Sequence, residues 1–218
     1  MTAKTDTTTR NAEAVFIVDD DAAICEGLCN LLESVGIRAE CYPSAEAIQQ
    51  SWNKSNAGCM LLDARLPGMS GVEFQDQMRR LGIAMPVIFM TAHGDVPMVR
   101  KVMKAGAVEF LTKPFQKEEL LDAIKHAFAF DRERRKNEET LNSIKARMGT
   151  LSSREREVMI RVTAGLLNKQ IAAELKLSEI SVKLHRRHVM EKMQADSLAE
   201  LVKICEQAKK ASRSASNS

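Results

Sequence analysis

A run of apolar residues that ends in a carboxylate constrains this chain more than any other feature of its sequence. Residues 59–62 are Cys-Met-Leu-Leu, and Asp63 follows them directly. Such a run is typical of a buried parallel strand that ends at the open edge of an α/β sheet. The Pro-Gly pair at 67–68 favours a tight turn, and Ser70 and Glu73 have the capping-box spacing that begins a helix. The sequence therefore predicts a strand, an exposed acid, a turn and a helix.

Five short apolar runs of this kind alternate with helical patterns over the first part of the chain. The alternation predicts one doubly wound parallel sheet, for which we expect the strand order 2-1-3-4-5. Ligands bind such a sheet outside the carboxyl ends of its strands. The expected strands are residues 14–18, 38–42, 59–62, 87–90 and 108–111, and the expected helices are residues 24–35, 44–53, 71–81 and 96–105, with a fifth from about 116.

Polar side chains follow four of these strands. Asp19 and Asp20 follow the first, Asp63 the third, Thr91 the fourth and Lys113 the fifth. Because three carboxylates held together repel, a hard divalent cation such as Mg²⁺, which prefers oxygen ligands, would stabilise them. Mg²⁺ also bridges to phosphate, so the pattern predicts a site where a phosphoryl group reaches the acid of the third strand. The lysine would pair with phosphoryl oxygens, and the threonine hydroxyl is a donor for them.

Each of these residues also has an ordinary structural interpretation. A lone acid after a strand is often a loop residue, and Asp21 can be simply a helix cap. Thr91 can be a strand-end residue and Lys113 a solvated charge. The interpretation as a site depends on their joint placement at one edge.

The charges of the chain are divided unevenly. Residues 1–129 contain 13 Lys and Arg against 17 Asp and Glu, a net charge of −4, whereas residues 148–218 contain 13 against 8, a net charge of +5. Residues 130–147 contain 6 against 4. The two parts are therefore expected to have different partners, and the basic part favours nucleic acid.

Composition also bears on where the protein works. No run approaches the roughly 18 apolar residues of a membrane span, and the Thr-rich residues 1–10 have no hydrophobic segment, so we expect a cytoplasmic protein. The cysteines are odd in number and lack the spacing of a zinc site, so we expect reduced, mostly structural thiols. They are Cys25, Cys29, Cys41, Cys59 and Cys205.

A charged segment separates the two parts of the chain. Residues 131–139 contain no apolar residue, no Pro and no Gly, and pairs such as Asp131 with Arg135 have helical i,i+4 spacing. This pattern predicts one helix from about residue 116 to 147, roughly 50 Å long at ~1.5 Å per residue. A flexible charged tether is the alternative.

Short helices follow from Leu151 onward. Capping boxes at Ser152 and Ser197 begin the first and the fourth of them, Asn168 is expected to cap the second, and residues 179–193 form a longer basic third helix. The fourth is expected to end near Ala208. A short helix, a tight turn and a longer basic helix are typical of a helix-turn-helix.

The third of these helices is expected to pack one face and to present the other to DNA. At about 100° per residue the packed face contains Val182, Val189 and Met193. Leu184 and Arg187 then point outward, where thymine methyl contacts and bidentate arginine contacts are made in a major groove. The remaining polar positions are Lys183 and His188 beside the outward face, Arg186 placed for phosphate, and His185 in a packing position.

The first part of the chain resembles the receiver domain of bacterial two-component response regulators. The resemblance is carried by Val18-Asp19-Asp20, by Asp63 with Leu66-Pro67-Gly68-Met69-Ser70-Gly71, by Thr91-Ala92-His93-Gly94 and by Phe110-Leu111-Thr112-Lys113-Pro114-Phe115. It implies that a sensor histidine kinase phosphorylates Asp63. It also implies a Mg²⁺ ion that Asp20 and Asp63 bind directly and Asp19 binds through water, with the backbone carbonyl of Arg65 completing the protein ligands. Thr91 and Phe110 are the implied switch pair. The Lys113–Pro114 bond is expected to be cis.

The second part resembles the LuxR-type DNA-binding domain. The matching segments are residues 151–158, Gly165, residues 168–172, residues 181–185 and residues 192–193. The whole chain is thus similar to FixJ-like response regulators of the FixJ/NarL class. This resemblance implies homodimerisation on phosphorylation, binding to a double-stranded operator and contact with RNA polymerase. The implied DNA-binding residues are Asn168, Lys169, Lys183, Leu184, Arg186, Arg187 and His188.

These observations together predict the organisation and the function of the chain. We expect a disordered tail (1–12), a receiver domain (13–129), a helical linker (130–147), a four-helix DNA-binding domain (148–210) and a second disordered tail (211–218). The predicted function is a phosphorylation-switched transcription factor. A DNA-binding regulator that ignores phosphate is one alternative. An aspartyl-phosphate phosphohydrolase is disfavoured because Arg65 occupies the position of its second carboxylate.

Overall fold

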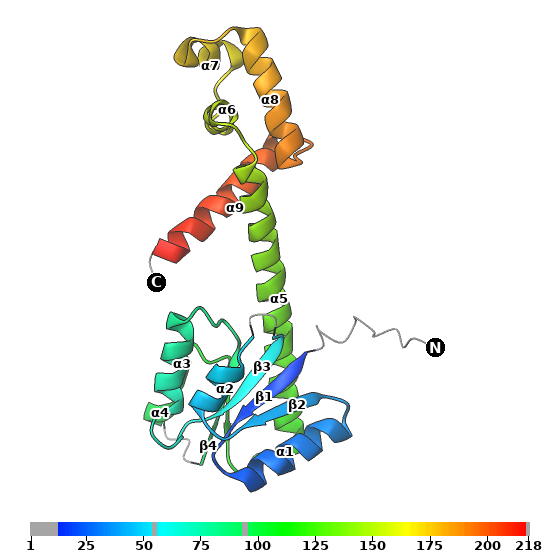
Figure 1. Cartoon of the computed structure of the whole chain (residues 1–218), viewed down its shortest axis with the longest axis vertical. Coiled ribbons are helices and arrows are strands. Elements are labelled where there is room, and N and C mark those ends of the chain that lie inside the picture. Colours follow the sequence, from blue (N-terminus) through cyan, green and yellow to red (C-terminus); the bar gives the residue numbers. More distant parts are fainter. Residues whose placement is uncertain (1–12, 54–55, 93–95, 217–218) are drawn as a thin grey trace, which may run out of the picture. The chain divides into compact units, whose positions relative to one another are not determined.

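The computed structural model describes residues 13–53, 56–92 and 96–216. The chain forms two compact units, Met1–Arg134 and Arg135–Ser218 (Figure 1). The disordered tail expected over residues 1–12 lies outside the described residues.

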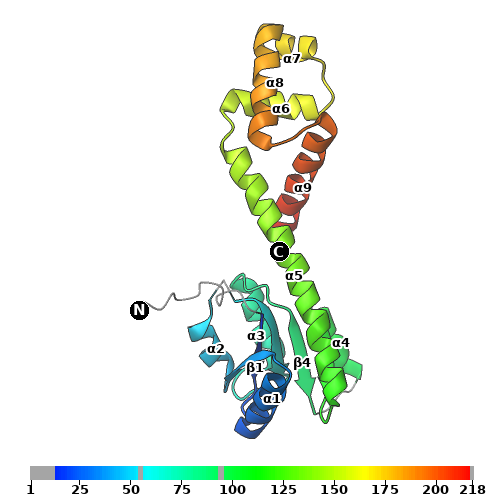
Figure 2. The same cartoon turned by 90° about the vertical axis from the view of Figure 1, so that its right-hand side faces the viewer.

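The first unit contains a five-stranded parallel sheet with the order β2-β1-β3-β4-β5, which confirms the predicted topology. Figures 1 and 2 show this sheet with its helices from two directions. Each strand is followed by a helix, so every crossover between parallel strands is helical. The elements are β1 (Ala14–Val18), α1 (Ala22–Ser34), β2 (Arg38–Tyr42), α2 (Ala45–Ser51), β3 (Gly58–Asp63), α3 (Gly71–Arg80), β4 (Val87–Thr91), α4 (Val96–Lys104), β5 (Glu109–Thr112) and α5 (Lys117–Gly149).

Both faces of this sheet are buried, which explains why its inner strands are apolar throughout. Side chains alternate along β1, so Val15 and Ile17 pack against α1 and the beginning of α5, whereas Phe16 and Val18 pack in the cluster that contains α2, α3 and α4. With both faces covered, the polar residues that end the strands remain at the edge of the sheet. The fold thereby concentrates them in one place.

Helix α5 runs without a break from Lys117 to Gly149, so the predicted long helix is confirmed and the flexible tether is wrong. Its charged middle contains no helix breaker, and one carboxylate in it is buried: Asp131 is 1% exposed. That carboxylate accepts a hydrogen bond from the Gly58 amide at 3.0 Å and pairs with Arg134 at 2.6 Å. Asp131 thus fastens α5 to the beginning of β3.

Only glycine fits at position 58, where β3 begins beside β1. Its φ is +129°, and a Cβ at this position would lie 1.9 Å from the carbonyl oxygen of Ala14 on the neighbouring strand. Glycine therefore allows β1 and β3 to approach closely where the Asp131 hydrogen bond is made.

The second unit is helical and contains the predicted helix-turn-helix. Its elements are the end of α5, α6 (Ser153–Thr163), α7 (Asn168–Leu175), α8 (Glu179–Met193) and α9 (Leu198–Ser216), which surround a core of aliphatic and methionine side chains. The Ser152–Glu155 capping box is present. Lys176 ends α7 in the left-handed conformation, with φ +53°, at a position where glycine is common.

Two local predictions in this unit were wrong. Asn168 does not cap α7, because Leu167 is the N-cap residue and the Asn168 amide oxygen instead accepts a hydrogen bond from Arg186. Helix α9 does not end near Ala208 and continues to Ser216, into the tail predicted to be disordered, since no Gly or Pro interrupts it. Within the described ranges, no helix is long and apolar enough to cross a membrane.

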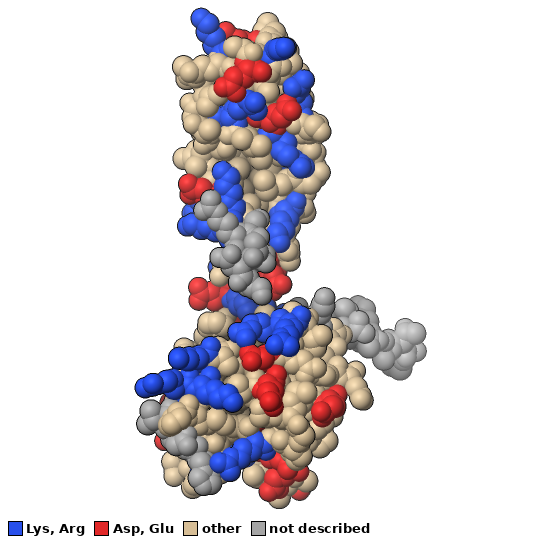
Figure 3. Space-filling model, turned by 90° about the vertical axis from the view of Figure 1, so that its left-hand side faces the viewer, with Lys and Arg blue, Asp and Glu red and all other residues tan. Residues whose placement is uncertain are grey.

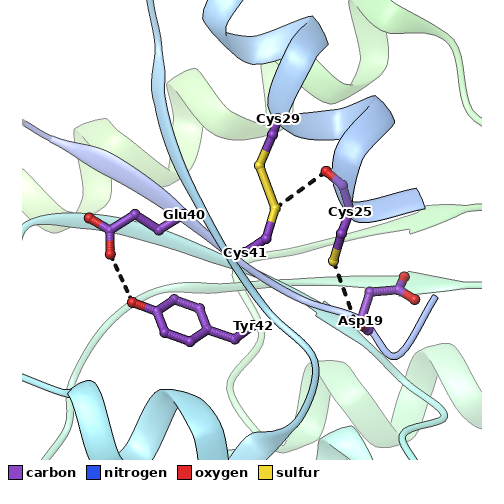
Figure 4. The surroundings of a disulfide bond; sticks show 6 residues. All are labelled: Asp19, Cys25, Cys29, Glu40, Cys41 and Tyr42. Atoms are coloured by element: carbon purple, nitrogen blue, oxygen red, sulfur yellow. Dashed lines mark hydrogen bonds between the residues drawn. A yellow bond between two sulfur atoms is a disulfide. The ribbon is translucent and has the colours of Figure 1, made fainter. Parts of the chain in front are cut away.

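The prediction that all five cysteines are reduced thiols was also wrong. Cys29 of α1 and Cys41 of β2 form a disulfide, whereas Cys25, Cys59 and Cys205 are free and buried (Figure 4). The crossover that makes β1 and β2 parallel places α1 against the edge strand β2, so residues distant in the sequence become neighbours. No local spacing signals such a pairing.

Replacing Asp131 with Ala should destabilise the first unit by about 1–3 kcal/mol, because the buried Gly58 amide loses its acceptor. Urea unfolding followed by the fluorescence of Trp52, the single tryptophan, measures this unit. Asp122→Ala is the matched control in the same helix, since Asp122 makes an exposed pair with Lys125 and its loss should change stability by less than about 0.5 kcal/mol. Equal effects of the two variants would contradict the assigned role.

Candidate functional site

Three strand ends bring two carboxylates and one ammonium group together in the first unit. Lys113 follows β5, and its Nζ lies 2.6 Å from a carboxylate oxygen of Asp19 and 2.6 Å from one of Asp63. The Asp19 side chain is 1% exposed and that of Asp63 is 15% exposed. The two acids therefore share one cation at the edge of the sheet, and Asp63 is the more accessible of the two.

Burial shapes the charges of this cluster. Burial raises the pKa of Asp19, and the hydrogen bond from Lys113 opposes this effect only in part. Burial also acts to lower the pKa of Lys113, but the hydrogen bonds with Asp19 and Asp63 outweigh it, so the pKa is raised. The lysine is therefore held in its charged form, and a further cation near Asp19 would favour the ionised carboxylate.

Backbone groups fix the orientation of the acids. The Arg65 amide donates to Asp63 Oδ1 at 2.7 Å, and the Asp21 amide donates to Asp19 Oδ1 at 3.0 Å. The Asp21 side chain caps α1, as its structural interpretation predicted. A Cβ on Gly71 would lie 2.4 Å from the Asp63 carbonyl oxygen, so the beginning of α3 approaches the site as closely as glycine permits.

Asp20, another predicted Mg²⁺ ligand, does not join the cluster of Asp19, Asp63 and Lys113. Asp20 is exposed, and its side chain makes no hydrogen bond or ion pair with the described residues. Among those residues no three acidic, His or Cys side chains converge as a metal cluster, and the Lys113 ammonium pairs with both Asp19 and Asp63. Three carboxylates with one ammonium still leave two negative charges, and their oxygen donors suit a hard divalent cation.

The two predicted switch residues lie on neighbouring strands. Thr91 ends β4 and is buried, and its carbonyl oxygen accepts a hydrogen bond from the Lys113 amide at 2.7 Å. Phe110 of β5 is half-buried and packs against the core cluster on the α3 and α4 side of the sheet. The Lys113–Pro114 bond is cis, as expected. Residues 93–95, including His93 and Gly94 of the third motif, lie outside the described residues.

In the second unit, α8 has the predicted division into a packed and an outward face. Val182, Val189 and Met193 are buried, whereas Leu184 is 52% exposed. Lys183 and Arg187 are also exposed. On the side of the molecule that Figure 3 shows, basic and acidic side chains are interspersed over the second unit.

Several of the expected DNA contacts have partners within the protein. Arg186 donates to Asn168 at 2.7 Å and so ties α8 to the beginning of α7, where Lys169 follows. Arg187 pairs with Glu191 at 2.8 Å on the exposed surface. The Nδ1 atom of His185 is buried and has no hydrogen-bond partner among the described residues.

A buried acid, Glu155, was seen in the sequence only as part of a capping box. It is 4% exposed, and Lys192 of α8 donates to it at 2.7 Å, with His188 Nδ1 at 3.6 Å from its other oxygen. The hydrogen bond with Lys192 lowers the pKa of Glu155 to about 2. This pair joins α6 to α8 across 37 residues. Short-range sequence patterns predict no contact at this separation.

Comparisons with known proteins match both units. Residues 15–125 match the model "Response regulator receiver domain", and residues 149–205 match "Bacterial regulatory proteins, luxR family". Nodulation protein W of Bradyrhizobium diazoefficiens is 48% identical over 88% of this chain and 85% of its own length. Transcriptional regulatory protein FixJ of the same organism is 40% identical over 87% and 93%. The solved structure of response regulator StyR is similar at a TM-score of 0.80, with 43% identity over 90% and 99% of the two chains.

The stability of the second unit should depend on pH through Glu155. Because its folded pKa of about 2 lies below the ordinary value of 4.5, the charged form stabilises the fold above about pH 4.5, and this contribution is lost as the pH falls toward 2. Glu155→Gln should cost about 1–3 kcal/mol at neutral pH and reduce the loss of stability on acidification.

Urea unfolding of the second unit is followed by circular dichroism. The part of the signal that changes together with the Trp52 fluorescence belongs to the first unit and is subtracted. Glu157→Gln is the control, since Glu157 makes an exposed pair with Arg154 in the same helix. An unchanged pH profile in the Glu155 variant would contradict the prediction.

Proposed function

Since this chain belongs to the FixJ-like response regulators, transcription regulators in which a receiver domain precedes a LuxR-type DNA-binding domain, we propose that phosphorylation of Asp63 controls its binding to DNA. The observation that carries this proposal is the Lys113 ammonium bridging Asp63 and the buried Asp19 at the edge of the sheet. In the proposed cycle a sensor histidine kinase in the cytoplasm donates the phosphoryl group.

The chemistry proposed for Asp63 is nucleophilic attack on phosphorus. One carboxylate oxygen attacks the phosphohistidine phosphorus, the P–N bond breaks, and an acyl phosphate forms. The Arg65 amide holds one oxygen of Asp63, and Lys113, already beside the other, is placed to pair with the incoming phosphoryl oxygens. Asp19, Asp20, Asp63 and the Arg65 carbonyl would hold Mg²⁺, which supplies charge neutralisation between carboxylates and phosphate when bound.

The added negative charge is proposed to act through Thr91 and Phe110. The Lys113 amide donates a hydrogen bond to the Thr91 carbonyl oxygen, so the two residues are held side by side at the edge where the phosphoryl group would bind. Movement of Thr91 toward the phosphoryl group would open space for the half-buried Phe110 ring to turn inward. The surface of α4, β5 and α5 would then favour a second copy, and homodimerisation would follow.

For DNA binding we propose that α8 enters a major groove. Lys183, Leu184 and Arg187 are exposed on its outward face, which supports a role for them in contacting base edges. Arg186, Asn168, Lys169 and His188 are proposed to contact phosphates. A dimer would bind a near-palindromic operator, and the bound dimer would contact RNA polymerase.

We propose no enzymatic turnover beyond phosphorylation and dephosphorylation of the receiver itself. An aspartyl-phosphate phosphohydrolase needs a carboxylate two residues after the nucleophile, and the exposed Arg65 stands at that position.

Asp63→Ala should abolish labelling of the protein by radioactive acetyl phosphate, because the accepting oxygen is removed. Chelation of divalent cations by EDTA should abolish labelling of the wild type. Asp76→Ala is the control, since Asp76 is an exposed acid of the same unit paired with Arg79. Undiminished labelling of the Asp63 variant would contradict the assignment.

Acetyl phosphate should raise the affinity for a selected operator by roughly five- to 150-fold at fixed salt, the usual range of coupling between two sites. Fluorescence anisotropy with labelled duplex measures this change, and Asp63→Ala should show none. Equal affinity with and without acetyl phosphate would instead support a regulator that ignores phosphate.

A further inference from the structure

The outward face of α8 carries an isoleucine that the fold does not use. Ile180 is 79% exposed, the largest value among the exposed large apolar side chains of the described residues. Leu184, one turn further along, is 52% exposed. The two residues have i,i+4 spacing and therefore form one aliphatic strip on the helix surface.

Folding does not account for this strip. The packed face of α8 consists of Val182, Val189 and Met193, which leaves Ile180 without a place in the core. A β-branched residue in an exposed first turn also has a lower helix propensity than alanine or glutamate. The side chain thus costs a little stability and removes little apolar surface from water within this unit, so its exposure points to a ligand that covers it.

The neighbours of the strip indicate what that ligand is. Lys183 and Arg187 lie on the same face at i+3 and i+7 from Ile180, which gives an aliphatic strip flanked by cations. Arg187 is held by Glu191 at 2.8 Å, so one of these cations is partly neutralised before any partner arrives. Cations suit phosphates and guanines, whereas aliphatic groups in a major groove find one apolar feature, the 5-methyl group of thymine.

The position of Ile180 is well defined by contacts on either side. Ser178 caps α8 by accepting from the Ser181 amide at 3.1 Å, and the two hydroxyls lie 2.8 Å apart. Arg186 ties the same helix to Asn168 of α7. A side chain on such a supported first turn is rigid enough to discriminate between bases.

We propose that Ile180 is a specificity-determining residue that, with Leu184, recognises the 5-methyl groups of thymines in the operator. This inference rests on the proposed function and adds to it the chemical class of base that the first turn of α8 selects. The strip spans about one helical turn, so its two members would contact thymines at neighbouring positions of a half-site.

The test compares thymine with deoxyuridine, which lacks only the methyl group. The full-length protein, phosphorylated with acetyl phosphate, is used to select duplexes from a random pool, and each thymine of the selected site is then replaced singly. At one or two positions in each half-site the replacement should weaken wild-type binding about three- to tenfold, the size expected from one buried methyl group.

The variant Ile180→Ala should bind the thymine and deoxyuridine forms equally at the position that Ile180 contacts. The alanine is compatible with the helix and leaves the core untouched, so circular dichroism should be unchanged. Ile160→Ala is the matched control, since Ile160 is also a largely exposed isoleucine but lies on α6, and this variant should discriminate like the wild type.

The outcomes separate this inference from the function on which it rests. If no duplex is selected by the phosphorylated protein, the proposed function fails and the inference with it. If duplexes are selected but Ile180→Ala retains the full preference for thymine, or no thymine position is sensitive to loss of its methyl group, only the inference is overturned.

Discussion

The two ion pairs of Lys113 with Asp19 and Asp63 are the interactions on which the functional site of the first unit depends. Two acids brought this close repel each other, and the buried one pays a desolvation cost, so the arrangement needs a cation between them. The three residues come from the ends of β1, β3 and β5. Only a parallel sheet with both faces covered by helices places these ends at one edge, and the cluster of charge is therefore a product of the whole unit.

A similar compensation organises the second unit. Glu155 is buried between α6 and α8, where Lys192 and the Ser152 amide satisfy it. This pairing directs one face of α8 inward. The other face carries the aliphatic strip and the cations that we propose contact DNA.

Helix α5 belongs to both cores. Leu120 and Ile124 pack beneath the sheet, and Ile144 packs in the core of the second unit. Between these contacts the helix is charged, and the buried Asp131 fastens it to the beginning of β3. The predicted linker is thus a structured element that each unit uses at one end.

The sequence by itself determined the strands, the helices, their order and the identity of the residues at the strand ends, because apolar periodicity, capping boxes and turn residues act over a few positions. Only the tertiary structure decided which distant residues touch: Lys113 with two acids, Asp131 with Gly58, Glu155 with Lys192 and Cys29 with Cys41. The same holds for Asn168, which local spacing made a cap and which Arg186 of another helix engages instead. Contacts of this kind depend on where the backbone places two side chains in space, and no short-range pattern encodes that distance.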